Sequence, residues 1–533
     1  MLPSLVLVSS LIPLFQVAFG ATAEQWRTRS IYQIITDRFA LEPGAVVNEC
    51  VVSEQTWCGG TWRAITQNLD YIQDAGFTAI WISPVSQNYH GPRSAYGDAY
   101  HGYWSADISK LNDKFGTADD LKARLSRSLL RYLMVDIVVN NVMSTSLTPA
   151  LSTYMFTKPQ HYHPYCPVDY SNITSEQQCW LGDTQVALPD LDTENADVIS
   201  RYSTWISDLV QTYSIDGLRI DAAKHVRKQF WPAFASSAGV FCMGEVFDPV
   251  VANVADYQGS DALDSVLNYP LYYALVSAFT IPGPQNMSAL IDNLNQSRAG
   301  YTDTTVLGNF LENQDVPRWH NLSVDPQSTY NAMTFTFLAE GIPIVYYGQE
   351  QYFSGNGDPY NREPLWLSNY TKTTAYQLMA SLNQLRNFMI YTTDWATQQM
   401  RILAASQNGI AFQKGEVVTV LTNIGAPPQN LTNTVFLSPW PRGTVAIDIV
   451  ACRQFVVASG GFLQVEYTKG GVPVVLVHPS ALSGSGVCAD TVGALYSGTV
   501  PSDTVAQSSA LRFALAPSLI ALVMVAVSGF VGG

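Results

Sequence analysis

Charged residues are scarce in this chain of 533 residues, at 13% of the total, against the ~25% that is typical of soluble proteins. This scarcity, beside a hydrophobic fraction of 47%, excludes a disordered polyelectrolyte. Basic residues are the scarcer class, with 28 Lys and Arg against 43 Asp and Glu and a net charge of −15. Few groups could therefore neutralise phosphates, and we expect no nucleic-acid partner.

The hydrophobic residues are in turn ample for a sizeable core. At ~150 residues per domain, the length predicts two to four domains, or one barrel with appendages. Aromatic residues reach 12%. Both bulky cores and flat ligands such as sugars would explain that excess.

The two ends of the chain have the pattern of targeting segments. Residues 1–20 form an apolar run that closes on Ala18-Phe19-Gly20, which predicts a secretory signal peptide. Residues 514–533 are apolar and follow a polar spacer and the small residues Ser497-Gly498-Thr499. This order predicts a GPI-anchor signal in 491–533, although a tail-anchored helix is the alternative and Ser508-Ser509-Ala510 is a competing attachment site. We expect a secreted protein that a GPI lipid holds at the outer face of the plasma membrane or in the cell wall.

An extracellular route predicts glycans and disulfides. Sequons occur at Asn172, Asn286, Asn295, Asn321, Asn369 and Asn430. Nearness in sequence suggests three local disulfides and leaves Cys242 as a buried thiol, although sequence alone does not determine the connectivity. The suggested pairs are Cys50–Cys58, Cys166–Cys179 and Cys452–Cys488.

The middle of the chain alternates short β-branched runs with amphipathic segments at 118–130, 198–213 and 375–389. This alternation predicts an α/β fold, a (β/α)₈ TIM barrel over 21–397, whose site would lie at the carboxyl ends of the strands. The strand candidates are 31–36, 79–82, 133–138, 217–220, 240–243, 306–310 and 342–346.

Two further units are expected. Residues 139–192 are too long for an ordinary loop and carry their own cysteine pair, so we interpret them as an excursion domain after the third strand. Alternating apolar and polar runs over 398–490 predict a C-terminal antiparallel β-sandwich.

Short motifs stand at the predicted strand ends and, for the fourth motif, in the excursion. In order they are Trp81-Ile82-Ser83-Pro84, Ala99-Tyr100-His101-Gly102-Tyr103-Trp104, Asp136-Ile137-Val138-Val139-Asn140-Asn141, Leu188-Pro189-Asp190-Leu191-Asp192, Gly217-Leu218-Arg219-Ile220-Asp221-Ala222-Ala223-Lys224-His225, Gly244-Glu245-Val246 and Phe310-Leu311-Glu312-Asn313-Gln314-Asp315. In this order, and over roughly residues 24–490, the chain resembles the fungal α-amylase family.

Retaining glycoside hydrolysis needs an ionised nucleophile and a protonated general acid. Asp221 follows Arg219 by two residues on one strand, so both side chains point the same way, and the guanidinium should lower the pKa of the carboxyl. Asp221 is therefore the predicted nucleophile. Glu245 follows an apolar run, and a drier setting there would favour the protonated form that a general acid/base needs. Asp315 would be the third carboxylate, which in the family grips sugar hydroxyls.

The resemblance also implies substrate contacts. Tyr103 would stack on the sugar at the cleavage point, with His101 and Trp104 beside it. Lys224 and His225 would line the acceptor side, whereas Asp358 and Arg362 look like the pair that closes the donor end.

Two positions depart from the family pattern. Its third-strand motif normally ends in His, where this chain has Asn141, and its seventh-strand motif has His at the position of Gln314. Both family histidines contact the sugar being cleaved. Amides keep hydrogen-bonding capacity but cannot become cationic. Loss of a charge-assisted bond of ~1.5–3 kcal/mol would slow the reaction by roughly 10–100-fold at each position.

A subgroup of fungal α-amylase relatives with GPI signals and altered versions of these histidines resembles this chain. Its members are 4-α-glucanotransferases that act on maltooligosaccharides and are linked to cell-wall α-glucan. Two alternatives stay open: an α-amylase that hydrolyses internal α-1,4 bonds of starch-like glucans, and a weakly active glucan-binding wall protein. Nothing in the sequence requires more than a monomer.

The resemblance finally implies a structural Ca²⁺ between barrel and excursion. Asn140, Asp190 and the carbonyl of His225 match its ligands, but Gln177 stands where an acidic ligand is expected. The oxygen ligands that Ca²⁺ prefers remain, with one negative charge fewer, so we expect weaker binding.

Overall fold

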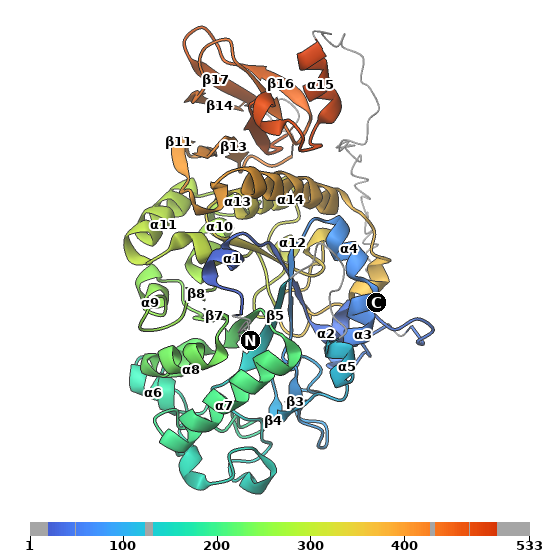
Figure 1. Cartoon of the computed structure of the whole chain (residues 1–533), viewed down its shortest axis with the longest axis vertical. Helices are drawn as coiled ribbons and strands as arrows, with labels where there is room; N and C mark the ends of the chain where they lie inside the picture. Colours follow the sequence, from blue (N-terminus) through green and yellow to red (C-terminus); the bar gives the residue numbers. More distant parts are fainter. Residues whose placement is uncertain (1–19, 48, 123–131, 427–431, 468–469, 498–533) are drawn as a thin grey trace, which may run out of the picture.

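The computed structural model describes residues 20–47, 49–122, 132–426, 432–467 and 470–497 (Figure 1). The predicted signal peptide, except its last residue, and nearly all of the predicted anchor signal lie outside these residues. Within the described ranges, no helix is both long enough and apolar enough to cross a membrane.

A parallel eight-stranded sheet forms the centre, in the order β8-β7-β6-β5-β2-β1-β10-β9. A parallel bridge from Leu267 to Gly308 brings its two edges together, which nearly closes the predicted TIM barrel. The strands are β1 Ile31–Ile34, β2 Ala79–Ile82, β5 Tyr132–Val138, β6 Gly217–Asp221, β7 Phe241–Gly244, β8 Ser265–Val266, β9 Gly308–Asn309 and β10 Ile342–Tyr346. Strand β8 was not predicted, because Ser265–Val266 stands outside the β-branched runs from which the other strands were predicted.

Helices surround this sheet (Figure 1). Helix α7 shows how the sequence sets one: the Asn195 side chain caps its first turn, and Ser214, at φ 47°, ends it. The helices are α1 Ala23–Arg27, α2 Thr36–Phe39, α3 Trp62–Gln67, α4 Leu69–Asp74, α5 Ala118–Lys122, α6 Ile173–Gln178, α7 Ala196–Tyr213, α8 Trp231–Ala238, α9 Val251–Ala255, α10 Tyr269–Phe279, α11 Met287–Gly300, α12 Trp319–Leu322, α13 Pro326–Leu338, α14 Thr374–Thr392 and α15 Ala489–Ser497.

The segment between β5 and α7 lies against the carboxyl end of the barrel. Asn141 and Asp190 form an antiparallel bridge at its base, so the beginning and the end of the excursion meet there. A short hairpin of β3 Ser86–Asn88 and β4 Ser105–Leu111 packs nearby, where the backbone N–H of Met143 donates to the carbonyl of Ser105 at 2.8 Å.

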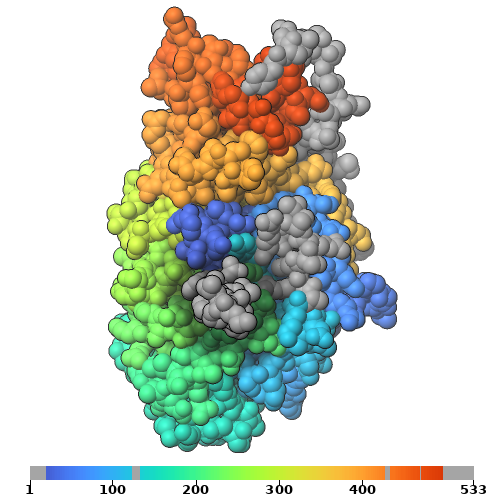
Figure 2. Space-filling model, in the orientation of Figure 1, coloured from blue at the N-terminus to red at the C-terminus, as the bar shows by residue number. Residues whose placement is uncertain are grey.

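The C-terminal domain has the predicted antiparallel architecture and stacks on one side of the barrel (Figure 2). A six-stranded sheet, β11-β12-β13-β18-β15-β16, packs on the pair β14–β17, with Val420, Val465 and Leu476 in the core between them. The strands are β11 Arg401–Ser406, β12 Gly409–Lys414, β13 Val417–Thr422, β14 Thr432–Leu437, β15 Val445–Asp448, β16 Arg453–Val456, β17 Phe462–Tyr467 and β18 Val474–Val477.

All three suggested disulfides are present: Cys50–Cys58, Cys166–Cys179 and Cys452–Cys488. Cys242 is the buried free thiol of the described residues, as predicted.

Candidate active site

Arg219 lies at the centre of the site and is fully buried. Strand β6 places Asp221 two residues further on the same face, and Arg219 Nη1 donates to Asp221 Oδ1 at 2.7 Å. Arg219 Nη2 lies 3.0 Å from Glu245 Oε2, because β7 runs parallel to β6 and ends beside it. One guanidinium thus holds the two carboxylates that were predicted as nucleophile and general acid/base.

Asp136, at the end of β5, is a third partner of Arg219 to which sequence reasoning assigned no role. Its two oxygens lie 3.0 and 3.1 Å from Arg219 Nη1, and it also accepts from the Tyr103 hydroxyl at 2.8 Å and Trp81 Nε1 at 3.1 Å. In sequence, Asp136 does not differ from other carboxylates near strand ends. Only its position in the third-strand motif could have marked it as a site residue. Asp136 holds Arg219 and Tyr103 in position.

Burial and mutual repulsion both raise the proton affinity of two of these carboxylates, Asp136 and Asp221. Burial raises the pKa of Asp136 to about 6 against the opposing Arg219. Burial likewise raises the pKa of Asp221 well above its ordinary value; Arg219 opposes this, and Glu245 and Asp136 add to it. The expectation of a lowered pKa at Asp221 is therefore wrong for the free protein, since it weighed only Arg219 and left out desolvation and the neighbouring anions.

Glu245 is buried as expected, at 8% exposed, but its neighbours are polar. Oε2 accepts from the backbone N–H of Ala222 at 2.9 Å, and Oε1 accepts from the Tyr269 hydroxyl at 3.2 Å. These contacts fix both oxygens of Glu245 at the end of β7. Tyr269 is a second positioning residue that the sequence gave no reason to select.

Asp315 follows β9 and faces the same cleft. Asp315 is open to solvent in this cleft, but desolvation by the cleft walls raises its pKa to about 7; the charge of Glu245 adds to this and Arg362 opposes it. Gln314 Nε2 donates to Asp315 Oδ2 at 2.7 Å, and Gln314 Oε1 accepts from Gln33 Nε2 at 2.6 Å. With 1% of its surface exposed, Gln314 lies behind Asp315. Asn141 is also buried, in the bridge at the base of the excursion.

A cavity of about 230 Å³ opens over these carboxylates. His101 Nδ1 accepts from the backbone N–H of Tyr103 at 3.0 Å, so the neutral ring carries its proton on Nε2. Burial, with Arg362 and Arg38 nearby, lowers the pKa of His101 well below its usual value and keeps it neutral. The cavity is lined by Gln55, Tyr96, Tyr100, His101, Tyr103, Trp104, Asp221, Asp315, Asp358 and Arg362.

The predicted donor and acceptor residues lie on separate sides of the carboxylates. Arg362 Nη1 lies 3.1 Å from Asp358 Oδ1 in the first cavity. Lys224 pairs with Glu176 at 3.2 Å and lines a second cavity of about 750 Å³. His225 Nδ1 donates to the Glu176 carbonyl at 2.9 Å, which holds α6 against this side.

Three of the four predicted calcium ligands come together. Asn140 Nδ2 lies 2.5 Å from Asp190 Oδ1 and 3.1 Å from the carbonyl of His225, and Asn140 Oδ1 is a buried oxygen without a hydrogen-bond partner among the described residues. The Asn140 NH₂ group faces the other two oxygens here; with the amide turned around, all three oxygens would fit a calcium ion. Gln177 does not join them: its Nε2 donates to the Tyr257 hydroxyl at 3.4 Å.

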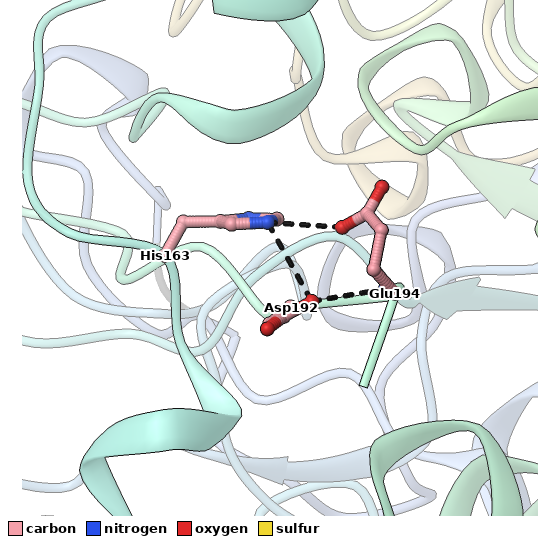
Figure 3. Close-up of side chains that lie close together, drawn as sticks. All are labelled: His163, Asp192 and Glu194. Atoms are coloured by element: carbon pink, nitrogen blue, oxygen red, sulfur yellow. Dashed lines mark hydrogen bonds and ion pairs between the residues drawn. The ribbon is translucent and has the colours of Figure 1, made fainter. Parts of the chain in front are cut away.

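A second cluster consists of His163, Asp192 and Glu194, whose side chains point toward one another (Figure 3). His163 Nδ1 lies 2.6 Å from Asp190 Oδ2, and its Nε2 faces Glu194 at 3.0 Å and Asp192 at 3.6 Å. Ligand atoms of His163, Asp192 and Glu194 lie within 4.8 Å of one another, so this is a possible acidic metal-binding group. The carboxylates outweigh burial and raise the pKa of His163, so a metal ion bound here would have to displace a proton from the imidazole.

A barrel with an excursion after its third strand, a β-sandwich behind it and carboxylates grouped around one arginine are the features of a glycosidase. The family model "Alpha amylase, catalytic domain" matches residues 33–389, and "Alpha-amylase, domain C" matches 402–495. The chain belongs to the α-amylase family.

Relatives cover most of the chain. Alpha-amylase 1 of Lipomyces kononenkoae is 44% identical over 479 residues, which are 88% of this chain and 76% of the relative. Alpha-amylase 2 of Schwanniomyces occidentalis is 41% identical over 486 residues, 88% of this chain and 94% of the relative. The solved structure of an alpha-amylase from Malbranchea cinnamomea, 39% identical, superposes with a TM-score of 0.83 over 88% of this chain and all of that one.

Proposed function

We propose that this member of the α-amylase family is a 4-α-glucanotransferase that acts on maltooligosaccharides and cell-wall α-glucan. The observation that carries the proposal is a complete set of carboxylates around Arg219 combined with neutral amides, Asn141 and Gln314, at the two positions where the family motifs carry histidine. The first feature supports a working enzyme. The second supports slow chemistry, in which a sugar acceptor competes well with water.

The first half of the reaction forms a covalent intermediate. Asp221 attacks the anomeric carbon of the bound glucan, and the bond to the glycosidic oxygen breaks as Glu245 gives that oxygen a proton. Arg219, 2.7 Å from Asp221, opposes the effect of burial and favours the anionic form that attacks. His101 offers its Nε2–H, and Asp315 a carboxylate, to the hydroxyls of the sugar.

The second half decides between transfer and hydrolysis. Glu245 takes a proton from the acceptor hydroxyl as its oxygen displaces Asp221 and regenerates the free enzyme. Water and the 4-hydroxyl of a second glucan are chemically equivalent acceptors. The cavity of about 750 Å³ beside Lys224 and the exposed ring of Tyr170 has room for a sugar acceptor, which transfer requires.

The test is to incubate the purified protein with maltopentaose and resolve the product lengths. Products longer than five glucose units support transfer; shorter products alone would refute it and leave hydrolysis, which the names of the relatives favour. An Asp221→Asn variant should lose both the transfer and the hydrolysis activity. If wild type shows no turnover while a Glu245→Gln variant binds maltopentaose equally well, the chain is a glucan-binding wall protein.

We also propose a structural calcium ion held by Asn140, Asp190 and the carbonyl of His225. Bound there, it would fasten the excursion to the barrel and take no part in bond breaking. Chelation with EGTA should lower the thermal midpoint, and added Ca²⁺ should restore it. An Asn140→Ala variant should show the lower midpoint with and without EGTA, whereas an EGTA response of wild-type size in that variant would contradict the assignment.

We further propose that the protein is a monomer held at the outer face of the membrane or in the wall by a GPI lipid. Treatment of intact cells with a phosphatidylinositol-specific phospholipase C, or glucanase for a wall-linked form, should release it. Release by neither treatment, with extraction by detergent alone, would support a membrane-spanning tail instead.

A further inference from the structure

A hydrogen-bonded chain runs from strand β1 through Gln33 and Gln314 to Asp315. Gln33 Nε2 donates to Gln314 Oε1 at 2.6 Å, and Gln314 Nε2 donates to Asp315 Oδ2 at 2.7 Å. Both glutamines are buried at 1% exposure. The donors therefore all point the same way, toward the carboxylate.

The direction of this chain matters because a glutamine amide has a donor at one end and an acceptor at the other. If the Gln314 amide were turned around, its carbonyl would face the Asp315 carboxylate, and two acceptors would repel each other. The NH₂ group of Gln33 selects the attractive orientation, because it can only donate to the Gln314 carbonyl.

We propose that Gln33 is a positioning residue for the glycosidase reaction: it locks the Gln314 amide with its NH₂ toward Asp315 and so holds Asp315 in place for the sugar. Gln33 does not line the cavity over the carboxylates, and neither does Gln314, whereas Asp315 does. Both glutamines thus act through Asp315.

The surroundings of Gln33 support this role. Its backbone is held between β2 and β10, opposite Trp81 and Tyr346, and its carbonyl accepts from Tyr347 at 2.9 Å. Its side-chain Oε1 is buried without a hydrogen-bond partner in the described part of the chain. An unsatisfied buried carbonyl destabilises a fold, so the Gln33 amide contributes little to stability. Its contribution is instead to orient Gln314 and, through it, Asp315.

The experiment measures the rate at which maltopentaose is consumed. Hydrolysis and transfer both consume it, so the result does not depend on which of the two reactions the enzyme favours. Gln33→Met keeps the length and removes the donor. We expect kcat to fall by roughly tenfold with KM within about twofold. The thermal midpoint should change little, because the unsatisfied Gln33 carbonyl is removed while the buried Gln314 carbonyl loses its donor. Gln33→Glu, which accepts where Gln33 donates, should turn the Gln314 amide around and lower kcat by roughly 10–100-fold.

A double-mutant cycle separates positioning from general structure. In a Gln314→Met background, where no amide remains to be oriented, Gln33→Met should have no further effect on kcat. The proposal is overturned if Gln33→Met keeps the wild-type kcat, or if it lowers kcat by the same factor in both backgrounds. A parallel fall in thermal midpoint and kcat would also overturn it. Should Gln33→Met not fold, Gln33→Asn, whose shorter amide cannot reach Gln314, takes its place in the cycle.

Discussion

Replacing Asp136 by Asn tests whether this buried carboxylate organises the active site. Asp136 accepts from Arg219 on one side and from Trp81 Nε1 and the Tyr103 hydroxyl on the other. An amide of the same shape has one acceptor end and one donor end. Whichever way it turns, an NH₂ group meets either the guanidinium or the Trp81 N–H, so at least one contact becomes repulsive.

The size of the effect follows from the bond that is lost. A hydrogen bond to a charged group contributes ~1.5–3 kcal/mol, and a change of that size in the transition state lowers the rate by roughly 10–100-fold. Arg219 also holds Asp221 and Glu245, so its displacement moves both reacting carboxylates. We expect kcat/KM for maltopentaose to fall by that factor, and the free energy of unfolding to fall by ~1.5–3 kcal/mol.

A matched control distinguishes loss of the site from loss of the fold. Asp448, in the β domain, is equally buried and accepts from Arg453 at 3.2 Å and from the backbone N–H of Val475 at 3.1 Å. Asp448→Asn should destabilise the protein without changing kcat/KM at 25 °C. The reasoning is refuted if Asp136→Asn keeps kcat/KM within about threefold of wild type, or if both variants lose activity equally.

Three further outcomes are expected. Asn141→His should raise maltopentaose turnover by about tenfold through a charge-assisted bond, and Gln314→His should raise it less, because that side chain is turned toward Asp315; equal gains would contradict this placement. The pKa of Asp315 is about 7 when folded and near 3.9 when unfolded, so its stabilising contribution is present below pH ~4 and is lost as the pH rises through 7. The thermal midpoint of Asp315→Asn should therefore fall less between pH 5 and 8 than that of wild type, and parallel curves would contradict the raised pKa. Replacing Cys452 and Cys488 by Ser opens a loop of 36 residues and should lower the free energy of unfolding by about 3–4 kcal/mol, to be measured by urea titration; an unchanged midpoint would mean that the bridge does not form.

The sequence by itself predicted the architecture, which the structure confirms, and the candidate reacting residues, which the structure brings together. Strands such as Ala79–Ile82 and Ile342–Tyr346 carry their own pattern, since continuous β-branched and apolar runs bounded by polar residues mark the buried strands of a barrel. Because such strands end at one edge, the carboxylates that follow them, Asp221 and Glu245 among them, were predictable as neighbours. Strand β8, Ser265–Val266, has no such pattern and forms because it pairs with strand β7.

Only the tertiary structure decided how many carboxylates surround the Arg219 guanidinium. The spacing of Arg219 and Asp221 predicted one ion pair, but the fold adds Asp136 and Glu245 from other strands, and burial together with repulsion reverses the expected direction of the pKa shift at Asp221. The chain from Gln33 to Asp315 likewise joins residues 281 positions apart at its first hydrogen bond. Desolvation and the direction of hydrogen bonds depend on what surrounds a side chain in space, and a linear pattern does not contain that information.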